Sequence, residues 1–123
     1  MTRPARPSDP SFAAWAAAIA TLASFPKTYI KLSGAFSETS DAVRGQDPLC
    51  MAEYLQPWFA TIVEAFGPRR MLFGSDWPVC TVGVDNAWGR WRQVVENMCA
   101  AEDLSEKHVA RILSGTAREV YLG

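Results

Sequence analysis

The sequence predicts an α/β fold with parallel strands. Two short segments, Thr28–Ser33 and Arg70–Asp76, have the pattern of β-strands, and segments with helical periodicity precede, separate and follow them. The stretch between the two strands is too long for a β-hairpin, and a long crossover that contains a helix joins parallel strands. The predicted order is therefore helix, strand, helix, strand, helix, helix.

The first predicted helix begins after Asp9, which is a good N-cap residue, with Pro10 at the first helical position. Its large apolar residues recur every three or four positions, as in an amphipathic helix that packs on a core; they are Phe12, Trp15, Ile19 and Leu22.

The two predicted strands differ in character. In Thr28–Ser33, apolar and polar residues alternate, so that Ile30 and Leu32 share one face and Lys31 lies on the other. The second, Arg70–Asp76, is a short apolar run that ends in a carboxylate, which is typical of a buried parallel strand.

A polar stretch, Ala35–Pro48, is predicted to be a long loop. Leu49–Phe66 has helical periodicity but contains Pro57, and we favour a new helix that starts at this proline. Gly67 follows the helix as its expected stop.

The C-terminal part is predicted to hold a helix that starts near Asp85 or Asn86 and a further helix capped by Ser105. Gly115 and Thr116 are expected to lead into a short terminal turn. Two strands cannot cover so many amphipathic helices, which indicates that the sequence is the end of a larger fold.

Composition excludes several partner classes. Twelve Lys and Arg residues against thirteen Asp and Glu residues give a net charge of -1, without a basic block, so neither nucleic acid nor a membrane surface is expected as a partner. The longest apolar run is too short to span a bilayer. Three dispersed cysteines, Cys50, Cys80 and Cys99, form no C-x-x-C motif and fit a reducing, cytoplasmic location.

Residues 66–79, with the sequence FGPRRMLFGSDWPV, resemble the last-strand signature of the amidohydrolase-related family, and within it the fucono- and rhamnono-lactonase-like enzymes. Tyr29–Gly34 looks like the penultimate strand of that family, and Leu104–Leu122 like its closing helix and tail, although Thr116 stands where an Asn is expected. The resemblance extends over nearly the whole chain from about Phe12.

This resemblance implies a metal-associated (β/α)8 TIM barrel, of which the chain would be the C-terminal part, the last two to three βα units. Residues 1–10 would be a flexible N-terminal segment, and residues 11–123 a partial amidohydrolase-related domain. The family's His-x-His and middle-strand histidines are not in this sequence, and its one histidine, His108, is expected on a solvated helix face.

Asp76 is the predicted catalytic residue. A carboxylate at the C-terminal end of a barrel strand faces the active site, where it can act as general acid/base or as a metal ligand. The alternative is that Asp76 only caps the turn before Trp77.

Three residues are predicted to bind substrate. Lys31 would point into the barrel and bind an anionic substrate or an oxyanion, or else form a structural ion pair. Ser33 could donate a hydrogen bond to the substrate. Trp77 could form the floor of a sugar-sized pocket, or else pack at the barrel rim.

The predicted function is hydrolysis of a sugar lactone or similar cyclic ester, with a divalent metal, zinc or manganese, in full-length relatives. This chain alone is expected to bind no metal and to be inactive. The alternative is a non-catalytic barrel fragment that acts as a homodimer or as partner of a full-length paralogue. A third interpretation is a small α/β ligand-binding domain unrelated to the family.

Overall fold

The computed structural model describes residues 8–35, 39–78 and 85–123. The predicted flexible segment therefore lies mostly outside the described residues. In chain order the elements are α1 (Pro10–Ala23), β1 (Ile30–Leu32), α3 (Asp41–Arg44), α4 (Pro48–Phe66), the short 3₁₀ turn η1 (Pro68–Arg70), β2 (Met71–Phe73), α5 (Ala87–Ala101), α6 (Glu106–Ala110), the π-helical turn η3 (Arg111–Gly115) and α7 (Thr116–Leu122).

β1 and β2 are parallel and form a two-stranded sheet, with Ile30 paired with Met71 and Leu32 with Phe73. The crossover between them contains α4, which confirms the predicted α/β arrangement. Both strands are shorter than predicted at both ends, because neighbouring turns take up their first residues and the ladder stops before Ser33 and Gly74. The hydroxyl of Thr28 donates to the carbonyl of Leu22 in the last turn of α1 and to that of Phe25 after it, and Arg70 belongs to η1.

The N-terminal helix is as predicted. Pro10 is its first residue, and the Asp9 carboxylate accepts a hydrogen bond from the backbone N–H of Ser11 at 2.9 Å. A cap of this kind satisfies one of the N–H groups that a helix leaves unpaired at its start.

The predicted break at Pro57 is wrong, since α4 runs without interruption through this proline. Proline has no N–H to donate, but packing compensates, because buried residues lie on both sides of it, including Met51 and Ile62. The helix begins instead where the Asp47 carboxylate accepts from two backbone N–H groups. The predicted loop also contains the short helix α3.

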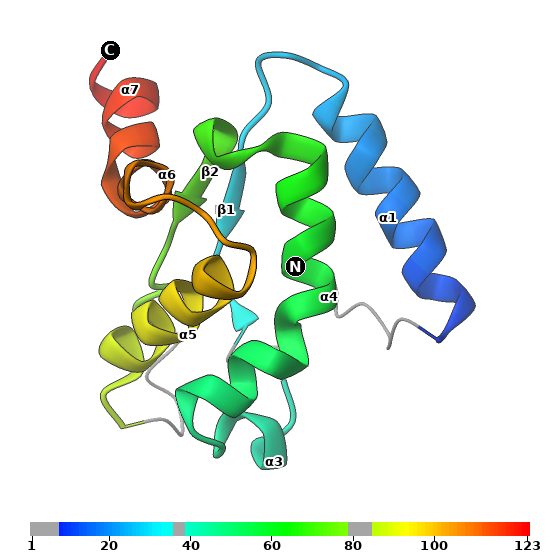
Figure 1. Ribbon diagram of the computed structural model, residues 1–123, viewed down its shortest axis with the longest axis vertical. Helices are drawn as coiled ribbons and strands as arrows, with labels where there is room; N and C mark the ends of the chain where they lie inside the picture. Colours follow the sequence, from blue (N-terminus) through cyan, green and yellow to red (C-terminus); the bar gives the residue numbers. More distant parts are fainter. Residues whose placement is uncertain (1–7, 36–38, 79–84) are drawn as a thin grey trace.

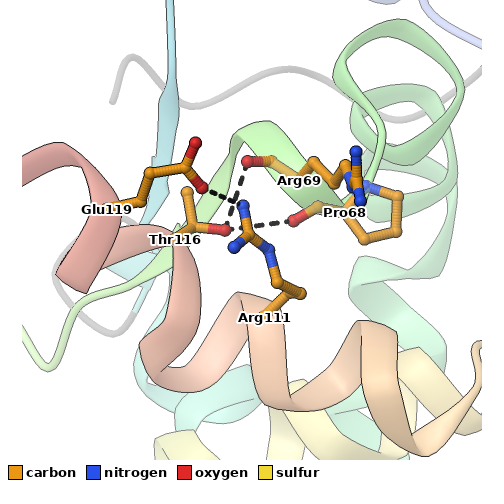
Figure 2. Close-up of polar contacts among 5 residues, drawn as sticks. All are labelled: Pro68, Arg69, Arg111, Thr116 and Glu119. Carbon is orange, nitrogen blue, oxygen red and sulfur yellow. Dashed lines mark hydrogen bonds and ion pairs between the residues drawn. The ribbon is translucent and has the colours of Figure 1, made fainter.

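The C-terminal segment is more helical than predicted. Ser105 caps α6 as expected, because its hydroxyl accepts from the His108 N–H. No terminal turn follows Gly115, since the backbone there stays helical and continues into α7. Figure 2 shows how this helical segment is tied to η1: the buried Thr116 hydroxyl donates to the carbonyls of Pro68 and Arg69 at 3.4 and 3.2 Å.

The core lies between the strands and the helices packed on them. α4 lies beside the strand pair, and α1 packs on the far side of α4 (Figure 1). Ile30, Leu32 and Met71 point into this core. Among the described helices, none is long and apolar enough to cross a membrane.

Candidate functional site

The two strands end at the same edge of the sheet. In Figure 1 both run toward the end of the molecule where α3 lies, and α7 lies at the opposite end. Ser33 and Gly34 follow β1, and residues 74–76 follow β2. The predicted site residues are therefore brought together here, at the carboxyl edge of a parallel sheet, where α/β proteins bind their ligands.

Asp76 is half-buried and has a left-handed backbone conformation, with φ of 61°. A non-glycine residue rarely adopts this conformation, and such residues concentrate at functional sites. Its carboxylate reaches toward the end of β1, because a Cβ atom added at Gly34 would lie 3.8 Å from Oδ2 of Asp76. The carboxylate thus bridges the space between the two strand ends.

Lys31 and Ser33 lie beside Gly74, the residue that directly follows β2. A Cβ atom added at Gly74 would be 2.7 Å from Cδ of Lys31 and 3.1 Å from Cβ of Ser33. The absence of a side chain at Gly74 therefore leaves the space that the lysine stem occupies. Lys31 is exposed and lies on the opposite face from the buried Leu32, as the alternation predicts.

Trp77 follows Asp76 and leaves 73% of its surface exposed. Its backbone N–H donates to the Ser75 hydroxyl at 3.2 Å, which holds the turn after β2. Most of this residue is therefore uncovered by the rest of the described chain, as an aromatic ring that contacts a ligand requires.

The described residues do not supply a complete metal site. Among them, no three His, Cys, Asp or Glu side chains lie close enough together to hold an ion. Zinc takes three or four protein ligands, whereas the strand ends offer the carboxylate of Asp76. His108 is exposed on α6, a helix that does not directly follow either strand. Zinc therefore does not fit the described residues of this chain alone.

Sequence reasoning missed one polar contact at the site. The helical spacing of Trp91 with Trp88 and Val95 is typical of a core residue, and Trp91 is buried. Its indole N–H, however, donates to the backbone carbonyls of Leu32 and Gly74. A periodicity of apolar residues gives no signal for such a contact, because it reports which face is buried and not where an N–H points.

Nearly the whole chain matches one protein family. The family model described as Amidohydrolase matches residues 1–122. The chain belongs to the amidohydrolase family. This membership contradicts the interpretation as an unrelated ligand-binding domain and confirms the resemblance read from residues 66–79.

Curated relatives of this amidohydrolase chain are lactonases, which are hydrolases. The chain is 34% identical to the L-rhamnono-gamma-lactonase of Scheffersomyces stipitis over 97 residues, which cover 78% of the chain and 29% of the relative. It is 32% identical to the L-fucono-1,5-lactonase of Burkholderia multivorans over 107 residues, which cover 85% and 34%. The chain thus spans about a third of the length of these relatives.

A solved structure agrees. An amidohydrolase from Burkholderia multivorans, crystallised with bound zinc, superposes on 94% of the amidohydrolase chain with a TM-score of 0.78 and 30% sequence identity. The match covers 39% of that neighbour. The arrangement of helices and strands described above therefore matches part of that longer neighbour.

Proposed function

We propose that this chain forms the last two to three βα units of a (β/α)8 amidohydrolase barrel that hydrolyses the ester bond of a sugar lactone or a similar small cyclic ester. The family, the lactonase relatives and the solved neighbour support this proposal. So does the position of the candidate residues at the carboxyl edge of parallel strands, where barrel enzymes have their active sites.

Asp76 acts as general acid/base in this proposal. Its carboxylate takes a proton from a water molecule as the water oxygen forms a bond to the lactone carbonyl carbon. When the bond between that carbon and the ring oxygen breaks, the protonated Asp76 returns the proton to the ring oxygen. The products are one hydroxyl and one carboxyl group on an opened chain, and the carboxylate is regenerated.

The neighbouring residues stabilise and hold the substrate. The ammonium group of Lys31, whose stem lies beside Gly74, stabilises the negative charge that develops on the carbonyl oxygen. Ser33 donates a hydrogen bond to the substrate, and the exposed indole of Trp77 stacks on the sugar ring.

One observation carries the proposal. The Asp76 carboxylate, held by a left-handed backbone, reaches across to the end of the strand that carries Lys31 and Ser33. A carboxylate that only capped its own turn would not need to approach Gly34. The approach of this carboxylate to the end of the other strand supports the role proposed for Asp76 as an acid/base group.

The test is a chimera in which this chain replaces the matching third of the L-fucono-1,5-lactonase of Burkholderia multivorans. We expect the chimera to hydrolyse L-fucono-1,5-lactone, and Asp76→Asn to lower kcat/KM by at least about 100-fold. Asparagine tolerates the left-handed conformation, so the backbone should be retained. The 123-residue chain without the rest of the barrel should show no turnover.

Asp103→Asn is the matched control, because Asp103 is also a left-handed aspartate but is exposed and remote in sequence from both strands. It should leave kcat/KM unchanged. A folded chimera in which Asp76→Asn and Asp103→Asn have equal activity would contradict the assigned role of Asp76. A folded chimera without lactonase activity would contradict the proposed reaction.

A further inference from the structure

Trp91 joins the ends of the two strands that carry the candidate site. Its indole lies on α5 and is 5% exposed. The indole N–H donates to the Gly74 carbonyl at 3.0 Å and to the Leu32 carbonyl at 3.2 Å. The Leu32 carbonyl also accepts from the backbone N–H of Gly74 at 3.1 Å. One side chain from a helix thus takes part in the last contacts between β1 and β2.

These contacts lie where the strand ladder stops. Both strands leave the extended conformation shortly afterwards, since φ is 78° at Gly34 and 61° at Asp76. Beyond this point the regular hydrogen bonds of the sheet no longer fix the distance between the two chains. The indole N–H therefore acts at the last position from which that distance can be set.

We infer that Trp91 is a positioning residue for the acid/base and substrate-binding groups at the strand ends. Ser33 directly follows one of its acceptors, and Asp76 lies two residues after the other. By holding both carbonyls with one donor, Trp91 sets the separation between the carboxylate and the groups on β1. This inference rests on the proposed function of Asp76, but the backbone effect can be measured without turnover.

The positioning effect depends on the indole hydrogen bonds and not on the packing of the ring. Phenylalanine preserves most of the apolar packing of a tryptophan but has no N–H. In Trp91→Phe, the Gly74 carbonyl loses its indole donor, and the Leu32 carbonyl keeps the backbone N–H of Gly74. The ends of the strands should then separate more easily, while the core around the ring stays packed.

Amide hydrogen exchange of the 123-residue chain, followed by NMR, tests this. We expect Trp91→Phe to accelerate exchange of the Gly74 amide about tenfold relative to amides in the middle of α4, such as that of Ile62. The amide resonances of Ser33, Gly34 and Asp76 should shift. Uniform acceleration at Gly74 and Ile62 would mean a general loss of stability and would overturn the inference.

Trp88→Phe is the matched control. Trp88 lies one turn earlier on the same helix, is half-exposed, and touches β2 by a ring contact with Phe73 at 6.5 Å between centroids. It should leave the Gly74 amide unchanged. The wild-type chain gives a second measurement that needs no variant: the Trp91 indole N–H should exchange far more slowly than that of the exposed Trp77. Equal rates for these two indoles would overturn the inference.

The lactonase chimera adds a functional measurement. Trp91→Phe should lower kcat at least tenfold with little change in KM and in melting temperature, whereas Trp88→Phe should leave kcat unchanged. A folded, active chimera in which Trp91→Phe retains full kcat would overturn the positioning role. If the chimera has no lactonase activity, the proposed reaction fails, and the exchange experiment still decides whether the indole fixes the strand ends.

Discussion

At the scale of single residues, Gly74 determines how Lys31 can lie. A methyl group in its place would come within 3 Å of two carbon atoms of the Lys31 stem. The stem can move aside because Lys31 is exposed, but it then leaves its place beside Gly74. A glycine at this position therefore has a steric role that follows from the side chain on the neighbouring strand.

Gly74→Ala should lower the free energy of unfolding by about 1 kcal/mol, the lower end of the usual cost of an inserted methyl group, because the exposed Lys31 stem can move aside. In a Lys31→Ala background the penalty should be smaller, because the two crowded carbon atoms are gone and only the contact with Ser33 stays tight. Urea unfolding of the four proteins measures this double-mutant cycle. Equal penalties in both backgrounds would show that Lys31 does not occupy the space above Gly74.

Cys99 makes stability depend on pH in the alkaline range. Burial, and then the negative charge of Glu96, raises the pKa of its thiol from 9.0 to about 11. Between these pH values the unfolded chain loses the thiol proton and the folded chain keeps it. The free energy of unfolding therefore falls as the pH rises through this window, and the contribution of the thiol is fully present below pH 9.

Comparison with Cys99→Ala isolates this contribution, because the other titrating groups cancel. The stability difference between wild type and variant should shrink by about 2 kcal/mol between pH 8.5 and pH 11. Urea titrations at several pH values measure it. A difference that stays constant over the range would show that the folded thiol titrates normally.

At the scale of elements, local signals predicted some features and could not predict others. The start of α1 follows from Asp9 and Pro10, because a cap depends only on neighbouring residues. The continuity of α4 through Pro57 does not, because it depends on packing against elements distant in sequence. Asp76 could be selected from the sequence because it ends a predicted strand, and Lys31 because alternation puts it opposite the apolar face of β1. The hydrogen bonds of the Trp91 indole could not, because they depend on the three-dimensional arrangement.

Pro57 should therefore be a strained position within α4. Its ring cannot donate to the carbonyl one turn earlier, and an interior proline typically costs about 3 kcal/mol. We expect Pro57→Ala to raise the free energy of unfolding by about 1–2 kcal/mol, since part of the gain is offset by a more flexible unfolded chain. Thermal and urea unfolding measure the change.

Pro48 in the same helix is the control, because proline is well suited to the first helical position. Pro48→Ala should give no increase in stability and a small decrease. A loss of stability in Pro57→Ala as large as that in Pro48→Ala would mean that the proline ring itself contributes essential packing.

At the scale of the whole molecule, the two ends of the sheet have different roles. The carboxyl end carries Asp76 and its neighbours, whereas contacts at the opposite end serve the fold. There the guanidinium of Arg111 pairs with Glu119 at 2.5 Å, and Thr116 binds the carbonyls of η1 (Figure 2). Under the proposed function this division is the one that barrel enzymes use, with the active site at the carboxyl edge and stabilising contacts at the other.

The described sheet has two strands, so each has a side that no other described strand covers. In the parallel ladder, the carbonyl of Leu32 points to β2, and the N–H and carbonyl of Lys31 therefore point away from it. Such an open edge can pair with another chain. Exposed aromatic rings close to the strands, including Tyr29 and Trp77, offer apolar contacts to such a chain. A net charge of -1 gives little electrostatic repulsion between copies.

We therefore expect the 123-residue chain to associate as its concentration rises through the micromolar range, as seen by sedimentation velocity. The lactonase chimera, in which further strands adjoin the same sheet, should sediment as one discrete species at equal concentrations. The contrast tests the origin of the association, because both proteins carry the same exposed rings but only one leaves the edge of β1 open. A 13.5 kDa monomer that persists at high concentration would show that this edge is already protected within the chain.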